Sequence, residues 1–83
     1  MEKGALFKND RGRWEFNTER GSVELSCGSV VEIFAFNAWL RGRIEADRQG
    51  YCFLHENDTD VIRDLAGTLA RLPEGARARG GMI

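Results

Sequence analysis

Hydrophobic and polar residues alternate in short runs along most of this chain, and turn residues separate the runs. In residues 13–17, Trp14 and Phe16 alternate with polar side chains, which predicts a strand with one buried face. An apolar run at residues 4–8 precedes it, and residues 9–12 between them are typical of turns. The two runs therefore predict a first β-hairpin.

The stretch from residue 30 to residue 54 predicts a three-stranded meander. Alternation places Val31 and Ile33 on one face of its first strand and Phe34 on the other. Both faces of that strand are largely apolar, so we expect it at the centre of the sheet. The three strands are expected at residues 29–36, 39–47 and 51–55.

The segment between the hairpin and the meander predicts one more short strand, at residues 22–25. A polar turn at residues 18–21 precedes this strand. Cys27 and Gly28 end it as a turn or a bulge, because a glycine inside an apolar run often marks such a break.

The last part of the chain predicts a helical turn and a final strand. Residues 60–66 have the apolar spacing of one short helical turn, with Thr59 as its N-cap and Gly67 just after its end. Residues 68–72 alternate again and predict a strand that closes the sheet. The fold class is therefore all-β, with six or seven short antiparallel strands in a small, partly open barrel. A flat sheet of this size would leave its edges exposed.

Length and composition indicate the size of the domain and the residues that form its core. With 83 residues the chain forms one domain, which we place at residues 1–72 and follow with a flexible tail at residues 73–83. Hydrophobic residues make up 42% of the sequence, which is too apolar for intrinsic disorder. Aromatic side chains bury the most area, so we expect the core to contain Phe7, Trp14, Phe16, Phe34, Phe36, Trp39, Tyr51 and Phe53.

Charge and apolar patterning restrict partners and compartment. The net charge is −1, without the basic excess of a dedicated nucleic-acid binder. Residues 1–10 lack the apolar core of a signal peptide, and no segment is apolar over the roughly 20 residues of a membrane helix. We therefore expect a cytoplasmic protein without a membrane partner. Its two cysteines, Cys27 and Cys52, are expected to be reduced, buried hydrophobic residues.

Several short motifs carry a family resemblance, which covers about residues 4–72. They are Gly12-Arg13-Trp14, Cys27-Gly28, Val31-Glu32-Ile33, Trp39, Arg43-Ile44-Glu45, Gly50-Tyr51 and residues 65–71. In these motifs the chain resembles an uncharacterised family of short bacterial domains carried on plasmids, conjugative elements and phages. The resemblance implies an SH3-like small barrel and an origin on a mobile element. It supplies no functional residues, and an acidic insert at residues 56–64 departs from the family pattern.

The sequence contains little that indicates a metal site or a catalytic site. Cys52 and His55 have the spacing of half a metal site, and Cys27 is a third candidate ligand. On a strand, however, Cys52 and His55 point to opposite faces. No serine lies in a nucleophile motif. We therefore expect no metal, no cofactor and no enzymatic activity.

One candidate surface combines an aromatic residue with arginines. Trp39, Arg41 and Arg43 project from one face of one predicted strand, and Arg63, Arg71 and the arginines of the tail are candidates to join them. Arginine beside an aromatic ring is suited to single-stranded nucleic acid. The alternative, which we favour, is that Trp39 belongs to the core and the arginines pair with carboxylates on neighbouring strands, Glu32 and Glu45.

A second candidate surface is acidic. It consists of Glu56, Asp58, Asp60 and Asp64. Such a loop is either solvated or imitates nucleic-acid phosphates in order to occupy a basic cleft of a partner protein.

The first functional hypothesis is therefore a non-enzymatic protein-interaction module of a phage or other mobile element. It would bind a host protein through the acidic surface or exposed strand edges, and its concrete form is an inhibitor of a host defence nuclease, like small anti-CRISPR proteins. The second hypothesis is a small barrel that binds nucleic acid or a nucleotide.

Overall fold

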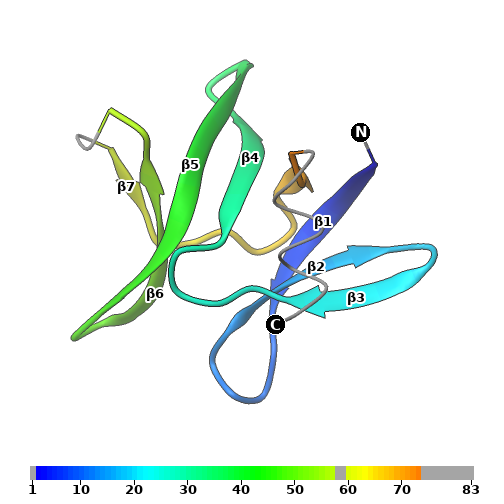
Figure 1. Cartoon of the computed structure of the whole chain (residues 1–83), viewed down its shortest axis with the longest axis horizontal. Coiled ribbons are helices and arrows are strands. Elements are labelled where there is room, and N and C mark those ends of the chain that lie inside the picture. Colours follow the sequence, from blue (N-terminus) through cyan, green and yellow to red (C-terminus); the bar gives the residue numbers. More distant parts are fainter. Residues whose placement is uncertain (1, 58–59, 74–83) are drawn as a thin grey trace.

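The chain folds into antiparallel β-structure, as the computed structural model shows for residues 2–57 and 60–73 (Figure 1). This part of the chain contains no helix. The all-β prediction is confirmed. The strands are β1 (Lys3–Lys8), β2 (Trp14–Thr18), β3 (Gly21–Glu24), β4 (Val30–Ala35), β5 (Ala38–Asp47), β6 (Gly50–His55), β7 (Val61–Ile62) and β8 (Leu69–Arg71).

All eight strands belong to one open sheet with the order β3-β2-β1-β8-β4-β5-β6-β7. The predicted first hairpin is β1–β2, and the predicted meander is β4–β5–β6. The predicted last strand is β8, which pairs with β1 on one side and with β4 on the other. The three N-terminal strands and the meander are therefore joined through β8, the last strand of the described part of the chain.

The predicted helical turn at residues 60–66 is wrong. Val61 and Ile62 instead form β7, which pairs with Leu54 and Phe53 of β6. The side chain of Arg63 then contacts Asp47 at the end of β5 through both terminal nitrogens. Forming a single helical turn orders several residues and gains only one hydrogen bond. Pairing with β6 and the ion pair of Arg63 provide several contacts instead. The proposed N-cap, Thr59, lies outside the described residues, as does the tail beyond residue 73.

The open sheet curls until its two halves touch. The indole N–H of Trp14 in β2 donates a hydrogen bond to the carbonyl of Tyr51 in β6, at 3.0 Å. The turn before β4 also reaches β5, because the N–H of Gly28 donates to the carbonyl of Ile44 at 2.7 Å. Cys27 and Gly28 form a turn and not a bulge, since the N–H of Ser29 donates to the carbonyl of Ser26 at 2.9 Å.

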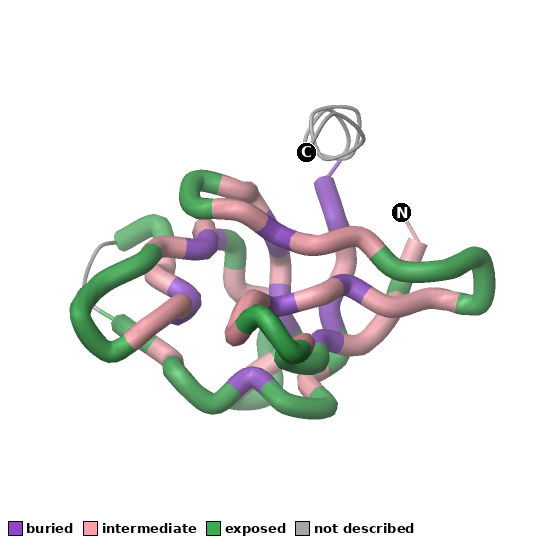
Figure 2. The backbone as a smooth tube through the Cα atoms, turned by 90° about the horizontal axis from the view of Figure 1, so that it is seen from below, coloured by how far each residue is buried: buried purple, intermediate pink, exposed green. Residues whose placement is uncertain are grey.

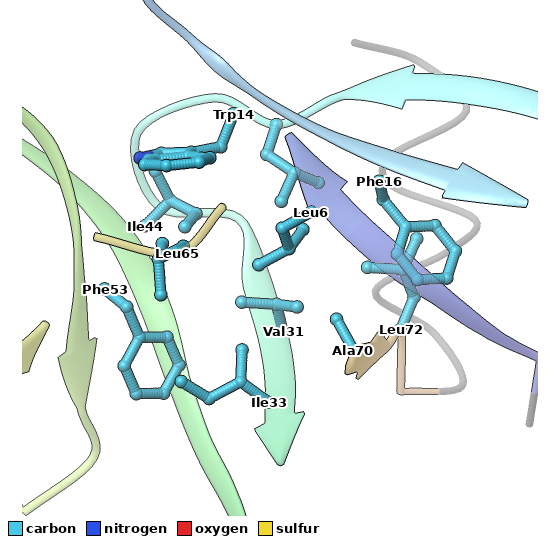
Figure 3. Packing of buried hydrophobic residues seen from close by; sticks show 11 residues of the cluster. Leu6, Trp14, Phe16, Val31, Ile33, Ile44, Phe53, Leu65, Ala70 and Leu72 are labelled. Atoms are coloured by element: carbon cyan, nitrogen blue, oxygen red, sulfur yellow. The ribbon is translucent and has the colours of Figure 1, made fainter. Parts of the chain in front are cut away.

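The core fills the interior of this curl, and it is built from alternate positions of the strands. Figure 2 shows exposed residues gathered at the turns and buried residues spaced along the strands. Val31 and Ile33, which alternation places on one face of their strand, are both 0% exposed, as is Ile44 of β5. Figure 3 shows side chains from both halves of the sheet packed together. The cluster consists of Leu6, Trp14, Phe16, Leu25, Val31, Ile33, Ile44, Phe53, Leu65, Ala70 and Leu72.

The expectation of a core made from all the aromatic residues is wrong for four of them, including Trp39, which is only half-buried. Trp14, Phe16 and Phe53 are buried, but Phe7, Phe34 and Phe36 are exposed. Phe7 and Phe34 each follow a fully buried residue on their strand, so alternation directs them outward. Phe36 lies in the turn between β4 and β5.

Gly42, in the middle of β5, is packed against β6 without space for a side chain. A Cβ atom at this position would lie 2.2 Å from the carbonyl oxygen of Leu54 and 2.6 Å from Cζ of Phe53. The backbone oxygen cannot move without disrupting the β5–β6 pairing. Glycine is therefore required at position 42 because β6 approaches closely, and not because of its backbone angles.

We expect Gly42→Ala to lower the free energy of unfolding by about 3 kcal/mol, because the added methyl group forces β5 and β6 apart. Urea denaturation followed by tryptophan fluorescence measures this change. Gly28→Ala is the matched control, since a Cβ there meets nothing within 4 Å. Its positive φ alone should cost about 1 kcal/mol. Equal losses in the two variants would contradict the packing explanation.

Candidate functional site

The outer face of β4 and β5 carries the first candidate surface. The β4–β5 register places Trp39 opposite Phe34, Arg41 opposite Glu32, and Arg43 opposite Val30. Because side chains alternate along a strand, Trp39, Arg41 and Arg43 project from the same face, as predicted. Trp39 is only half-buried, so the expectation that it belongs to the core is wrong.

Arg71 of β8 connects the elements of this face. Its guanidinium carbon lies 3.9 Å from the centroid of the Trp39 ring, within the range of a cation–π contact. Its Nε atom donates to Oε1 of Glu32 at 2.6 Å. The β8–β4 register, in which Arg71 pairs with Glu32, produces this contact. From the sequence, Arg71 was one of several further candidates, and only the pairing of β8 with β4 distinguishes it.

Another candidate, Arg63, lies elsewhere. It contacts Asp47 at the opposite end of β5 from Trp39. Hydrogen bonds from the Arg63 guanidinium and, to a smaller extent, from the backbone N–H of Gln49 hold the pKa of the Asp47 carboxyl below its ordinary value. Arg63 therefore fastens the segment after β7 and takes no part in the surface around Trp39.

The arginines of the outer face pair with Glu32 and Glu45, as we favoured from the sequence, but Glu45 lies on β5 itself and not on a neighbouring strand. Nη1 of Arg41 lies 3.7 Å from Oε2 of Glu32, the same carboxylate that binds Arg71. Arg43 forms an ion pair with Glu45 two residues further along β5. This contact and a hydrogen bond donated by the Cys27 thiol lower the pKa of Glu45. The face has mixed charge, with two guanidinium groups sharing Glu32.

Aromatic and aliphatic side chains are exposed around these charges. Phe34 is 41% exposed, and its ring meets that of Trp39 edge to face, with 5.5 Å between centroids. Leu69 is 42% exposed and lies on the same side of β8 as Arg71, two residues away. Phe36, at the tip of the β4–β5 hairpin, is 82% exposed. We call the set Phe34, Phe36, Trp39, Leu69 and Arg71 the outer aromatic surface.

The predicted acidic surface is divided in the structure. Glu56 and Asp60 flank the turn between β6 and β7, where Oδ2 of Asp60 lies 3.6 Å from Nδ1 of His55. Asp64 follows β7 at its other end, and its Oδ1 accepts a hydrogen bond from the N–H of Ala66 at 3.3 Å. Asp58 lies outside the described residues. Among the described members, only Glu56 and Asp60 share one end of β7.

The cysteines and the histidine do not come together as ligands. Cys52 is buried, and burial raises the pKa of its thiol, whereas Cys27 is exposed at the turn before β4. The expectation of a buried residue is therefore right for Cys52 and wrong for Cys27. In residues 2–57 and 60–73, no group of three His, Cys, Asp or Glu side chains could hold a metal ion.

The comparisons with known proteins give a family and no function. A family model described as "Domain of unknown function (DUF5348)" matches residues 4–72. This range contains seven of the strands entirely and all but the first residue of β1. Searches of curated proteins and of solved structures found no match. Within the described part of the chain, no helix has the length and apolarity needed to cross a membrane.

We expect Arg71→Met to lower the free energy of unfolding by about 1–2 kcal/mol. The variant keeps an apolar stem but removes the contact with the Trp39 ring and leaves Glu32, 13% exposed, without its closest cation. Urea denaturation measures the loss. The control is Arg48→Met in the exposed β5–β6 turn, which should change stability by less than about 0.5 kcal/mol. Equal effects of the two variants would contradict the role given to Arg71.

The Asp47–Arg63 pair predicts a pH dependence of stability. The folded-state pKa of Asp47 is lowered, so the contribution of the pair is complete above the unfolded pKa of about 4 and is lost as pH falls through the folded pKa. Asp47→Asn should therefore lower Tm at pH 7 and change it little at pH 2, as measured by circular dichroism. Asp10→Asn, in the exposed β1–β2 turn, is the control. A Tm difference that is the same at both pH values would contradict the prediction.

Proposed function

The chain belongs to the DUF5348 family, which has no assigned function, and we propose that it is a non-enzymatic module that binds a protein through its outer aromatic surface. The observation that carries the proposal is the exposure of Phe34, Phe36 and Leu69 beside the half-buried Trp39. These four side chains lie on β4, the β4–β5 turn, β5 and β8, and the sheet brings these segments together.

Exposed aromatic side chains of this kind are costly for a domain of 83 residues, whose core is small. Binding energy at protein interfaces is concentrated in aromatic residues and arginine, whereas lysine and glutamate are depleted there. The outer aromatic surface has this composition, with Arg71 at its centre. Its rings are also held in place, since Trp39 contacts both Phe34 and Arg71. A partner would therefore meet a preformed surface.

Nucleic acid is the second candidate ligand, through Trp39, Arg41 and Arg43. One observation favours nucleic-acid binding. Arg41 and Arg71 share the single carboxylate of Glu32, so one positive charge beside the exposed rings is not neutralised. Against it, each arginine of β5 already faces a carboxylate, and the net charge of the chain is −1. We therefore rank protein binding first.

The finer form of the proposal concerns origin and target. The resemblance to domains of plasmids, conjugative elements and phages supports a cytoplasmic protein of a mobile element with an SH3-like fold, and a host defence nuclease as its target. In that form Glu56, Asp58, Asp60 and Asp64 would enter the basic cleft of the nuclease. The division of the described acidic residues by β7 makes the outer aromatic surface the stronger candidate.

Site-specific photo-crosslinking in a bacterial host tests the proposal. A photoreactive phenylalanine analogue is placed at Ala38, which is exposed at the tip of the β4–β5 hairpin between the Phe36-Asn37 turn and Trp39, at Asp60 on the acidic side, or at the control position Gln49. Ala38 and Gln49 are both exposed and lie at opposite ends of the β5 hairpins. We expect a discrete crosslinked protein from position 38 and none from position 49.

The remaining outcomes separate the alternatives. A crosslinked protein from position 60 alone would move the interface to the acidic residues. Nuclease-sensitive crosslinks from position 38 would replace protein binding by nucleic-acid binding. Affinity for a single-stranded oligonucleotide should then fall steeply with salt. The absence of crosslinks from positions 38 and 60 would reject the proposal.

A further inference from the structure

The β4–β5 hairpin turns through two residues in the left-handed region of backbone conformation. Phe36 has a φ of +53° and Asn37 a φ of +63°. Positive φ at both central residues is the pattern of a type I′ turn, which connects two-residue hairpins. Asparagine and glycine adopt this conformation readily, but a bulky residue such as phenylalanine is a genuine outlier there.

The fold gains little from Phe36 that would offset this strain. Its side chain is 82% exposed, the largest exposure among the large hydrophobic residues of the described part of the chain. The hairpin is fixed by other contacts, because β4 and β5 pair along six positions from Val30–Arg43 to Ala35–Ala38. Strained residues that persist in an otherwise well-determined structure tend to occur at functional sites.

We propose that Phe36 is a preorganised anchor that inserts into an apolar pocket of a protein partner, and that acidic residues surround this pocket. The inference rests on the proposed function and specifies the partner for the same surface. The hairpin fixes the backbone of Phe36 before binding, so only the rotamer freedom of the side chain is lost when the ring enters a pocket. Aromatic anchors of this kind are typical hot spots of interfaces.

The charges on the outer face, four to five positions from the anchor along β4 and β5, indicate acidic residues on the partner. Arg41 and Arg71 share the single carboxylate of Glu32, and the side chain of Arg41 remains 52% exposed. An additional carboxylate from a partner would complete the pairing of Arg41. A second copy of this chain is a poorer occupant, because a symmetric contact through the same surface would bring the arginines of both copies together.

The substitution Phe36→Asn separates the anchor from a structural role. Asparagine suits positive φ, so the unfolding equilibrium constant should fall roughly five-fold, as measured by urea denaturation. Affinity for the protein crosslinked at position 38 should fall at least about 30-fold, as measured by titration of the purified pair. Phe7→Asn is the matched control, since Phe7 is 50% exposed on β1 and lies outside the outer aromatic surface. It should leave affinity unchanged.

Arg41→Gln tests the acidic partner. It should reduce the association rate at low salt and have little effect at high salt, because steering by charge is screened. An association rate that does not change would overturn the acidic character of the pocket.

Each other outcome has one meaning. If wild type binds the crosslinked protein and Phe36→Asn binds it equally well, the anchor is rejected while the proposed function stands. If Phe36→Asn lowers stability, the side chain is structural and the anchor is rejected. If position 38 crosslinks only to a second copy, seen as a dimer by light scattering, the pocket belongs to this chain and the inference is overturned. If wild type captures nothing, both proposals fail.

Discussion

The pairing of β8 with both β1 and β4 is the constraint on which the rest of this structure depends. Three residues, Leu69–Arg71, connect the N-terminal strands to the meander and complete the single sheet. Ala70 faces inward and is fully buried in the core. The curl of the sheet then brings Trp14 of β2 within hydrogen-bonding distance of β6. A short strand that is distant in sequence from both of its neighbours thus determines how the two halves pack.

The same strand assembles the outer aromatic surface. Residues on either side of Ala70 point outward, so Leu69 and Arg71 lie on the face opposite to the core. Arg71 contacts Trp39 from β5 and Glu32 from β4 at once. Stability and the geometry of the candidate site are therefore coupled, because any loosening of β8 would separate these groups.

Strain and exposure coincide in the β4–β5 hairpin. The turn holds Phe36 in a backbone conformation that phenylalanine disfavours, and its ring is left in solvent. Neither feature stabilises the isolated domain. Both are consistent with a surface that is completed by a partner, where burial of the ring would offset the cost of the turn.

The sequence by itself determined the strands of the hairpin and the meander, since alternation is a local property that the backbone converts directly into faces. It also placed Trp39, Arg41 and Arg43 together. Only the tertiary structure decided that residues 61–62 form a strand, that Phe34 and Phe36 stay exposed, and that Arg71 stacks on Trp39. Those outcomes depend on which distant strands become neighbours, and local periodicity does not encode the order of strands in a sheet.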